Sequence, residues 1–447
     1  MTKILLVSAD HVGATMAGPG IRYYQFARQL SERFEVTLMV PPGSDVEVPG
    51  VAVVNAGELR GRRFRRFARS FDAVVAQTLR AWTMRSLARS DVRVVYDLYD
   101  PLIVENLGFY AGQALPEQAR RSSYRASALL QEIALATGDA FVCASERQRD
   151  LWLGGLGSAG RLDPALYERD ATLRELIDVV PFGLDTQPPA GGKRVLKGVV
   201  DGIRETDKLL LWGGGIWNWF DPLTLIRAVG RIAEHREDVK LYFLGVKHPN
   251  PMVQEMAMTN HAVELARELD LLDRHVFFNF GWVPFEERGS YLLEADLGVS
   301  SHFDNVETRF AFRTRILDYL WAELPVVTTR GDVLADLVEV RGLGRTVGYE
   351  DVAGWVDAVT SLLDDEAEYR RARESIRTVR PEFAWPRLVE RLAALCLVPG
   401  GRVGSTRSVL VLTGAYIWHA LLGLFLQRGA VATIRESIAV LRRPRVP

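Results

Sequence analysis

Short apolar runs alternate with longer amphipathic stretches along most of this chain, and this alternation restricts its fold more than any other feature of the sequence. The apolar runs of the first half are rich in Val, Ile and Leu and occupy residues 4–8, 35–40, 51–54, 73–76, 92–96 and 140–143. Continuous apolar runs of this kind are typical of parallel strands that are covered on both faces. Most of the stretches between them are amphipathic, so the sequence predicts an α/β fold built from βαβ units.

The same alternation begins a second time near residue 208. Residues 208–215 read as a strand that ends in three glycines, and Asp221 and Pro222 follow as an N-cap and a first helical residue. We expect a helix over residues 223–235 and later strands at residues 240–244, 276–278, 296–300 and 326–329. The repetition predicts two Rossmann-like domains in tandem.

A segment rich in Pro and Gly, residues 186–193, separates the two alternating regions and is the expected domain boundary. The 447 residues exceed the roughly 250–300 at which a single hydrophobic core stops growing. We therefore expect an N-terminal domain over residues 1–190, a second domain over residues 191–395 and a C-terminal helical extension over residues 396–447.

Charge and cysteine content limit the class of protein further. The chain has 55 Lys and Arg against 56 Asp and Glu, and a formal net charge of −1 provides no overall field to hold nucleic acid. Its two cysteines, Cys143 and Cys396, are too few for a disulfide framework or a zinc cluster. The N-terminal apolar run is too short for a signal peptide. We expect a cytoplasmic protein without a nucleic-acid partner.

Two segments have the composition of sequences that contact membranes. Residues 409–426 contain one titratable side chain, His419, and a helix of this length spans about 27 Å, against about 30 Å for the hydrocarbon core of a bilayer. Residues 60–69 hold six arginines and two phenylalanines, and the tail after residue 426 is also basic. The segments favour peripheral contact with an anionic membrane at its inner face. For residues 60–69 the alternative is a solvated helix between strands.

Glycine-rich turns after the first strand of each half are the first candidate sites, because ligands of open parallel sheets bind beyond the carboxyl ends of the strands. Gly18 and Gly20 follow the first strand, with Arg22 beside them. A dinucleotide site is disfavoured because Tyr23 replaces the third glycine of its fingerprint and no carboxylate ends the second strand. The alternative for this segment is a flexible surface loop.

In the second half, three consecutive glycines, with Gly214 and Gly215 as the ligand-facing pair, indicate a place from which side chains are excluded. Trp282 is a candidate for stacking on a nucleotide base, with a core position as the alternative.

The densest polar cluster lies between residues 300 and 319. It holds Arg309, Arg313 and Arg315, whose guanidinium groups suit phosphate, together with Glu307 and Asp318 as acceptors for hydroxyl groups. The alternative is a solvated helix face with intrahelical ion pairs, which contribute little. Four aromatic residues interleave with the charges, and a site is therefore the better interpretation.

At these residues the chain resembles retaining glycosyltransferases of family 4, of the glycosyltransferase group 1 type, over about residues 1–395. The likeness rests on the Gly18–Gly20 segment, residues 180–185, the Gly213–Gly215 strand end and residues 317–327. The resemblance implies the GT-B fold, in which two Rossmann-like domains face each other across a cleft. It also implies that Asp318, seven residues before Pro325, binds the ribose of the nucleotide and that Arg315 faces the diphosphate.

Several positions depart from the family pattern. Phe310 stands where the family has the first of two glutamates, and Tyr99 stands where many members carry a histidine. The acceptor side then falls to Arg22, Tyr99, Asp100 and Glu105. The glycine turn of the second half also lacks the usual cations, so Arg309, Arg313 or Lys247 must supply charge.

The resemblance implies a nucleotide-sugar-dependent glycosyltransferase that moves a sugar to an acceptor hydroxyl with retention, in polysaccharide, cell-envelope or glycoconjugate biosynthesis. We expect catalytic roles for Arg313, Arg315 and Glu307, and donor contacts from Gly18, Gly20, Gly214, Gly215, Lys247, Trp282, Arg309 and Asp318. The nucleotide-sugar is a co-substrate, no cofactor or metal is expected, and the acceptor is a sugar or a lipid-linked sugar. The alternative is a catalytically silent sensor of sugar nucleotides, or a partner subunit of an active enzyme.

Overall fold

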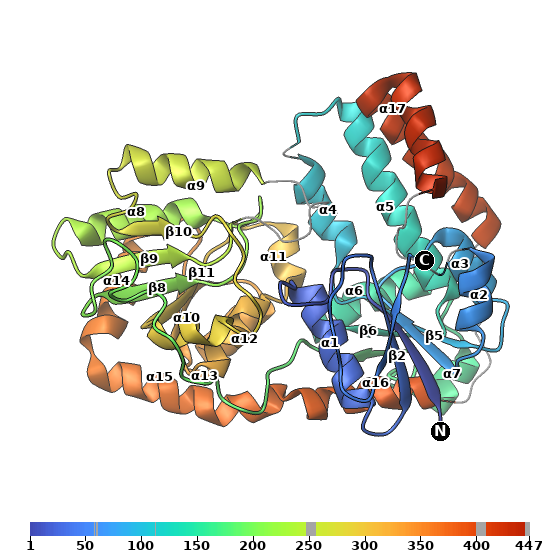
Figure 1. The fold of residues 1–447 in the computed structure, drawn as a ribbon, viewed down its shortest axis with the longest axis horizontal. Helices are drawn as coiled ribbons and strands as arrows, with labels where there is room; N and C mark the ends of the chain where they lie inside the picture. Colours follow the sequence, from blue (N-terminus) through green and yellow to red (C-terminus); the bar gives the residue numbers. More distant parts are fainter. Residues whose placement is uncertain (58, 60, 112, 247–255, 399–407, 443–447) are drawn as a thin grey trace. The chain divides into compact units, whose positions relative to one another are not determined.

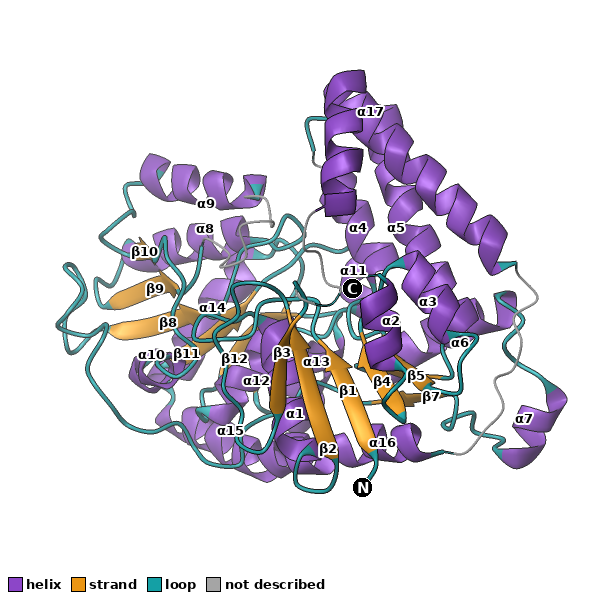
Figure 2. Ribbon diagram, turned by 45° about the vertical axis from the view of Figure 1, so that its right-hand side comes forward, coloured by secondary structure: helices purple, strands orange, loops and turns teal. Residues whose placement is uncertain are grey.

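The computed structural model describes residues 1–57, 59, 61–111, 113–246, 256–398 and 408–442. The chain forms two compact units. Unit 1 comprises Met1–Pro181 and Leu388–Pro447, and unit 2 comprises Phe182–Arg387. Each unit is a parallel β-sheet flanked by helices (Figures 1 and 2). The predicted α/β architecture with two Rossmann-like domains and a C-terminal helix is confirmed.

Unit 1 contains a seven-stranded sheet in the order β3-β2-β1-β4-β5-β6-β7, and all neighbouring strands are parallel. The strands are β1 (Lys3–Val7), β2 (Glu35–Val40), β3 (Ala52–Asn55), β4 (Ala73–Ala76), β5 (Arg93–Asp97), β6 (Ala140–Cys143) and β7 (Ile177–Val179). The helices are α1 (Gly18–Leu30), α2 (Arg62–Ala68), α3 (Ala81–Leu87), α4 (Leu102–Ala111), α5 (Glu117–Thr137), α6 (Glu146–Ser158), α7 (Pro164–Arg169) and α17 (Val409–Arg442), with most of α16 (Trp385–Leu397). Central strands such as β4 and β6 are buried at every residue, as their continuous apolar sequence predicts.

Unit 2 contains a six-stranded parallel sheet in the order β10-β9-β8-β11-β12-β13. The strands are β8 (Lys208–Trp212), β9 (Val239–Phe243), β10 (Val276–Phe278), β11 (Leu297–Ser300), β12 (Val326–Thr329) and β13 (Gly344–Val347). The helices are α8 (Pro222–Ala233), α9 (Ala257–Glu268), α10 (Arg288–Glu294), α11 (Val306–Phe310), α12 (Thr314–Trp321), α13 (Val333–Arg341), α14 (Val352–Asp364), α15 (Glu366–Val379) and the 3-10 helix η1 (Arg380–Phe383). Asp221 caps α8 as predicted, accepting a hydrogen bond from the amide of Thr224 at 3.0 Å.

The boundary between the units differs from the predicted one at residue 190. Unit 2 already begins at Phe182, because the turn-rich segment packs against it rather than forming a linker. The indole of Trp321 donates to the carbonyl of Gln187 at 2.6 Å. Leu184 pairs with the chain near Phe383 through a backbone hydrogen bond of 2.7 Å. Turn-forming residues thus fold onto the second unit instead of separating the two.

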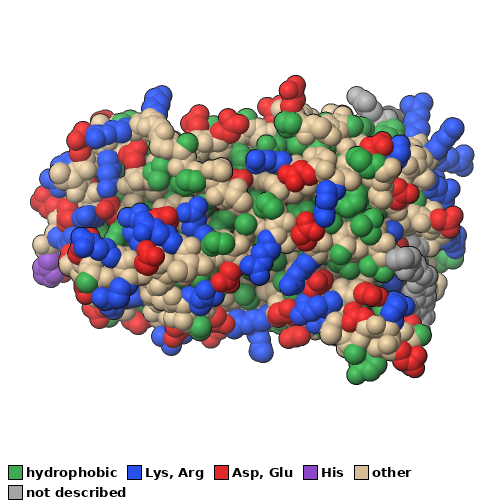
Figure 3. All heavy atoms as spheres, turned by 90° about the horizontal axis from the view of Figure 1, so that it is seen from below, with side chains coloured by type: hydrophobic (Ala, Val, Ile, Leu, Met, Phe, Trp, Pro, Cys, Tyr) green, Lys and Arg blue, Asp and Glu red, His purple; other side chains and the backbone are tan. Residues whose placement is uncertain are grey.

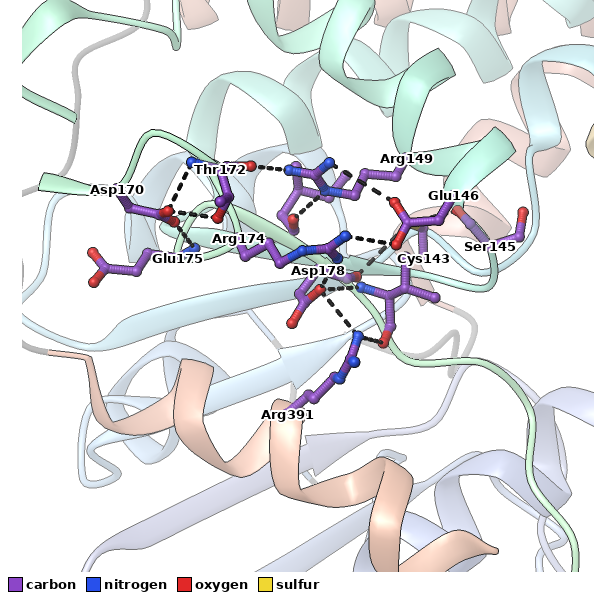
Figure 4. Close-up of polar contacts among 12 residues, drawn as sticks. Cys143, Ser145, Glu146, Arg149, Asp170, Thr172, Arg174, Glu175, Asp178 and Arg391 are labelled. Atoms are coloured by element: carbon purple, nitrogen blue, oxygen red, sulfur yellow. Dashed lines mark hydrogen bonds and ion pairs between the residues drawn. The ribbon is translucent and has the colours of Figure 1, made fainter. Parts of the chain in front are cut away.

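The C-terminal segment also returns to unit 1 earlier than predicted, at Leu388 rather than at residue 396. Figure 4 shows the polar contacts that fix α16 there. Arg391 of α16 donates at 3.4 Å to the carboxylate of Asp178 and to the carbonyl of Val179. Asp178 also accepts from Arg174 at 2.5 Å, and Arg174 donates to Glu146 at 2.7 Å. Long-range ion pairs of this kind carry no signal in the local sequence.

The segment Gly18-Pro19-Gly20 forms the first turn of α1, whereas the sequence predicts a glycine-rich turn ahead of the helix, with a surface loop as the alternative. Proline suits the first positions of a helix, where its missing N–H would have no intrahelical partner. Gly20 is buried, and a Cβ at this position would lie 2.2 Å from the carbonyl oxygen of His11. Gly20 is therefore required for the close approach of two backbone segments.

The apolar segment 409–426 lies in α17, and residues Val409–Arg428 are long and apolar enough to cross a membrane. Only 17% of its most apolar window is buried. On the face of the molecule drawn in Figure 3, Lys and Arg side chains intermingle with Asp and Glu.

Candidate functional site

The glycine turn after β8 is held in place by one buried tyrosine. The amide of Gly213 donates to the hydroxyl of Tyr319 at 2.8 Å, and this hydroxyl donates to the carbonyl of Val299 at 2.8 Å. Gly214 has a φ of +77°, a backbone conformation that residues with a Cβ rarely adopt, and a Cβ there would meet no atom within 4 Å. The turn therefore presents backbone beside open space at the carboxyl end of the sheet.

Arg315 of α12 reaches this turn. Its side chain is 8% exposed, and Nη2 donates to the carbonyl of Gly215 at 2.9 Å. The guanidinium carbon lies 4.4 Å from the ring centroid of Trp212 and 4.3 Å from that of Phe220. Nη1 has no hydrogen-bond partner among the described residues. Burial lowers the pKa of Arg315 to about 10. A buried cation with a spare donor is poised to receive an anion.

Arg313 and Glu307 are engaged with each other. Two nitrogens of Arg313 donate to the two carboxylate oxygens of Glu307 at 2.7 and 2.6 Å, and both side chains are 5% exposed. This bidentate pair fixes α11 to the start of α12. The structure gives Arg313 and Glu307 a structural contact, and their direct action on a substrate stays a prediction. Their charges neutralise each other, and the pair positions the helix that carries Arg315.

The other residues predicted to contact the donor do not all lie at the glycine turn. Arg309 is exposed and does not join the glycine turn. Trp282 packs over Gly245, where a Cβ would lie 3.0 Å from the indole ring. Trp217 and Trp219 stack with ring centroids 5.3 Å apart, and the Trp217 indole nitrogen lies 3.8 Å from the place of a Cβ on Gly215. Lys247 lies outside the described residues.

Asp318 lies on α12, one turn after Arg315, in a second charged group. Its carboxylate lies 3.5 Å from Nε of Arg288, and Nη2 of the same arginine lies 3.5 Å from the carboxylate of Asp185. The Arg288 guanidinium stacks 3.7 Å from the ring centroid of Phe285. Desolvation raises the pKa of Asp318, although Arg288 opposes the shift.

Sequence reasoning missed two buried groups in unit 2, His302 after β11 and Asp332 after β12. Nε2 of His302 lies 3.1 Å from the carbonyl of Arg330 and therefore carries the proton, while Nδ1 has no partner among the described residues. Desolvation lowers the pKa of His302 to about 3 and raises that of Asp332 to about 6. Asp332 caps α13 through one carboxylate oxygen, and the other lies 3.7 Å from His302. The sequence offered one indication of these residues, since each lies shortly after a predicted strand.

In unit 1 the structure gives Arg22 a structural role. Nε and Nη2 of Arg22 donate to both carboxylate oxygens of Asp97 at 2.7 and 2.9 Å, and other N–H groups donate to the carbonyls of Val180 and Pro181. Both charged side chains are completely buried. Arg22 therefore ties α1 to β5 and to the end of unit 1, and its contact with an acceptor stays a prediction.

In unit 1, Asp100 is a carboxylic acid whose pKa is strongly raised. It follows β5 and accepts a hydrogen bond from Gln77, which follows β4, at 3.2 Å. Desolvation, strengthened by the charge of Asp97, raises the pKa of Asp100 to about 7. Tyr99 lies beside the start of α1, with its hydroxyl 3.6 Å from the place of a Cβ on Gly18, and Glu105 lies in the first turn of α4. Gly18, Tyr99, Asp100 and Glu105 thus share the carboxyl end of this sheet.

The described residues hold no group of three or more His, Cys, Asp or Glu that is arranged to bind a metal ion. Each cysteine, Cys143 and Cys396, is free and buried. The sheet of unit 2 has Arg315 and the glycine turn at its carboxyl end, and the sheet of unit 1 has the carboxyl group of Asp100 there.

Comparison with known proteins adds a family match in unit 2. Residues 207–365 match the family model described as glycosyl transferases group 1. Sequence comparison with curated proteins finds no match.

Solved structures match nearly the whole chain. Sucrose-phosphate synthase from Thermosynechococcus elongatus has a TM-score of 0.61 and 17% identity, covering 88% of this chain and 98% of that one. WaaG, a glycosyltransferase involved in lipopolysaccharide biosynthesis, has a TM-score of 0.61 and 15% identity, covering 89% and 100%. HepE from Anabaena, in complex with UDP-glucose, has a TM-score of 0.60 and 14% identity, covering 88% and 99%. At these identities the likeness establishes the fold.

Proposed function

We propose, from the premise that this chain carries a glycosyl transferases group 1 domain on a GT-B fold, that it moves a sugar from a nucleotide-sugar to an acceptor hydroxyl with retention of anomeric configuration. Unit 2 binds the donor and unit 1 contributes to the acceptor. Polysaccharide, cell-envelope or glycoconjugate biosynthesis is the setting, in a cytoplasmic enzyme at the inner face of a membrane.

The observation that supports this proposal most strongly is the state of Arg315. Folding buries its cation with one hydrogen bond to Gly215 and leaves Nη1 without a partner among the described residues. Burying a charge without an opposite charge is costly. A diphosphate on Nη1 supplies that charge, and the open backbone at Gly214 leaves room for its oxygens.

In the reaction, the bond between the anomeric carbon and the β-phosphate oxygen breaks, and a bond to the acceptor oxygen forms on the same face of the sugar. The electron pair of the broken bond stays on the diphosphate. The acceptor hydroxyl gives its proton to the departing phosphate oxygen. Arg315 and the amides of the glycine turn stabilise the negative charge of the leaving group, a preorganised electrostatic contribution. In this scheme Arg315 and the backbone amides supply the positive charge that the leaving group needs, and no cofactor is used.

Asp318 is proposed to accept hydrogen bonds from the ribose hydroxyls. Its carboxylate lies 3.5 Å from Nε of Arg288. The carboxylate is therefore attracted by this cation but does not form a close bidentate ion pair with it. Trp282, beside Gly245, is the proposed stacking surface for the base.

On the acceptor side, we assign Asp100 as the residue that orients the hydroxyl, with Tyr99 and Glu105 nearby. The acceptor is a sugar or a lipid-linked sugar. The involvement of the structurally similar WaaG in lipopolysaccharide biosynthesis supports an envelope-related acceptor.

A silent sensor of sugar nucleotides, or a partner subunit of an active enzyme, is the second candidate. The closed Arg313–Glu307 pair favours it, because neither group is available to act on a substrate. An active transferase would turn over the nucleotide-sugar, whereas a silent sensor or partner subunit would bind it without turnover.

A thermal-shift panel of nucleoside diphosphates and their sugars identifies the donor, since a ligand of the folded state raises its stability by mass action. The donor is then incubated with and without acceptors, and released nucleoside diphosphate and glycosylated product are measured. Product with the anomeric configuration of the donor, determined by NMR, supports retaining transfer. Saturable binding without release of nucleoside diphosphate would instead establish the sensor.

A further inference from the structure

The C-terminal helix α17 is attached to unit 1 along one of its faces. It lies beside α5 in both ribbon views (Figures 1 and 2). Leu412 is buried and packs into the core of unit 1. Further along, Gln427 donates to the hydroxyl of Ser123 on α5 at 2.9 Å, and a Cβ on Gly423 would lie 2.8 Å from the same hydroxyl. One face of the helix therefore contacts unit 1 between Leu412 and Gln427.

The opposite face of α17 is apolar and exposed. Its exposed side chains are Leu410 (52%), Val411 (69%), Ile417 (37%), Trp418 (64%), Leu421 (41%) and Phe425 (48%). At 3.6 residues per turn, these six positions fall within an arc of about 120° on one side of the helix. Large contiguous apolar patches on soluble proteins mark interaction sites.

A basic helix, α2, is connected to α17 through the short helix α3. Short helix α3 contacts both α17 and α2, and it carries Trp82 with 51% exposure. The sequence of α2 is RRFRRFA, without an acidic residue. Arg62, Arg63 and Arg66 are exposed, and no ion pair joins them to an acidic residue in the described parts of the chain. Exposed cations beside exposed tryptophans are complementary to anionic lipid headgroups over acyl chains.

We propose that α17, Trp82 and the arginines of α2 together form a docking surface for an anionic lipid bilayer, with α17 lying in the plane of the interface. This surface, called the lipid-facing surface below, deepens the acceptor side of the proposed function and depends on it only for its biological purpose. The helix lies on the membrane rather than across it. Crossing would require the face that holds Leu412, Gly423 and Gln427 to leave α5 and would expose polar groups to lipid.

The test is flotation of the full-length protein with vesicles of phosphatidylcholine alone or mixed with phosphatidylglycerol, at low and high salt. We expect flotation with the anionic vesicles, weakened by salt because charge attraction is screened. Wild-type protein that remains in the soluble fraction with anionic vesicles at low salt would overturn the proposal.

Two variants separate the contribution of the apolar face of α17 from that of the arginines of α2. The double substitution W418E/F425E places charges on the apolar face, and we expect binding to both vesicle types to fall at least about tenfold. The double substitution R62A/R66A should weaken binding to anionic vesicles by about twenty-five-fold, since each basic residue contributes a factor of about five, and should leave binding to neutral vesicles unchanged.

Matched controls lie elsewhere on the surface. Tyr167 on α7 is 59% exposed and Val340 on α13 is 80% exposed, so Y167E/V340E adds the same charges away from the lipid-facing surface. R371A/R387A removes two exposed arginines of other helices. Controls that lose flotation as strongly as the test variants would reject the surface. Thermal unfolding and the thermal shift by nucleoside diphosphates should be the same in all variants, which separates failure of this proposal from failure of the proposed transferase function.

Two other occupants give distinguishable results. A second copy of the chain on the apolar face would produce a lipid-free dimer by light scattering that W418E/F425E converts to a monomer, without flotation. A spanning helix would resist extraction by alkaline carbonate. Either result would overturn docking in the plane of the membrane, whereas a monomer released by carbonate is expected.

Discussion

Replacement of Arg315 by methionine tests the central contact of the proposed function. The change keeps an unbranched side chain between Trp212 and Phe220 and removes the cation. We expect turnover to fall by about 10²–10³, the usual effect of losing one preorganised donor to a developing anion. This corresponds to about 3–4 kcal/mol of transition-state stabilisation.

Stability should respond in the opposite direction. Burial lowers the pKa of Arg315 from above 12 to about 10, and roughly two pH units at about 1.4 kcal/mol each amount to about 3 kcal/mol spent on keeping this cation buried. Arg315→Met removes that cost along with one hydrogen bond of about 1 kcal/mol to the carbonyl of Gly215. We therefore expect a melting temperature equal to or above that of the wild type, and a smaller thermal shift with the nucleoside diphosphate.

Arg313→Met is the matched control, two residues away. It leaves the carboxylate of Glu307 buried without its partner, which costs about 3–5 kcal/mol. The assays are thermal unfolding with and without nucleoside diphosphate, and steady-state kinetics of sugar transfer. An Arg315→Met enzyme that keeps its turnover within a few-fold, or that is destabilised as strongly as Arg313→Met, would refute the reasoning.

Three further outcomes are expected. Asp97→Asn leaves the cation of Arg22 buried without its charge partner and should destabilise the protein by about 3–5 kcal/mol in denaturant unfolding; an unchanged midpoint would show that the pair is dispensable. Since the pKa of Asp100 is raised to about 7, ionisation of this carboxyl lowers stability between about pH 4 and pH 7. Asp100→Asn should therefore equal the wild type near pH 4 and be more stable at pH 8 by about 4 kcal/mol, from roughly three pH units at about 1.4 kcal/mol each; a difference independent of pH would contradict the shift. Tyr319→Phe removes the hydroxyl between Gly213 and Val299, and we expect a loss of about 1–3 kcal/mol in stability together with a lower kcat; full activity would mean that the turn holds its shape without this contact.

The predicted GT-B fold is confirmed by the structural likeness, and residues 207–365 match the family model of glycosyl transferases group 1. Retention, the sugar, the base and the membrane contact stay predictions. Among the predicted site residues, the structure brings Arg315 and Gly214–Gly215 together at one sheet and Gly18, Tyr99 and Asp100 together at the other. It assigns Arg22, Arg313 and Glu307 to structural ion pairs.

Strand β13 could not be predicted from its local sequence. Its sequence, Gly-Arg-Thr-Val, lacks an apolar run, and it was not predicted. It forms because the backbone of β12 offers a parallel partner from Val326 to Thr329. A strand at the edge of a sheet needs less apolar sequence than a central strand, since fewer of its side chains are buried.

The sequence by itself determined the elements whose side chains are buried on all sides, such as β4 and β6, because only continuous apolar residues satisfy that environment. It also determined the helix start at Asp221-Pro222, where the capping group lies next to the amides it serves. Only the tertiary structure decided between Arg313 and Arg315. The two side chains have the same chemistry, and the difference arises because α11 brings Glu307 to one of them and the glycine turn brings a single carbonyl to the other. Partners of a buried charge are chosen by the fold, and local sequence does not encode them.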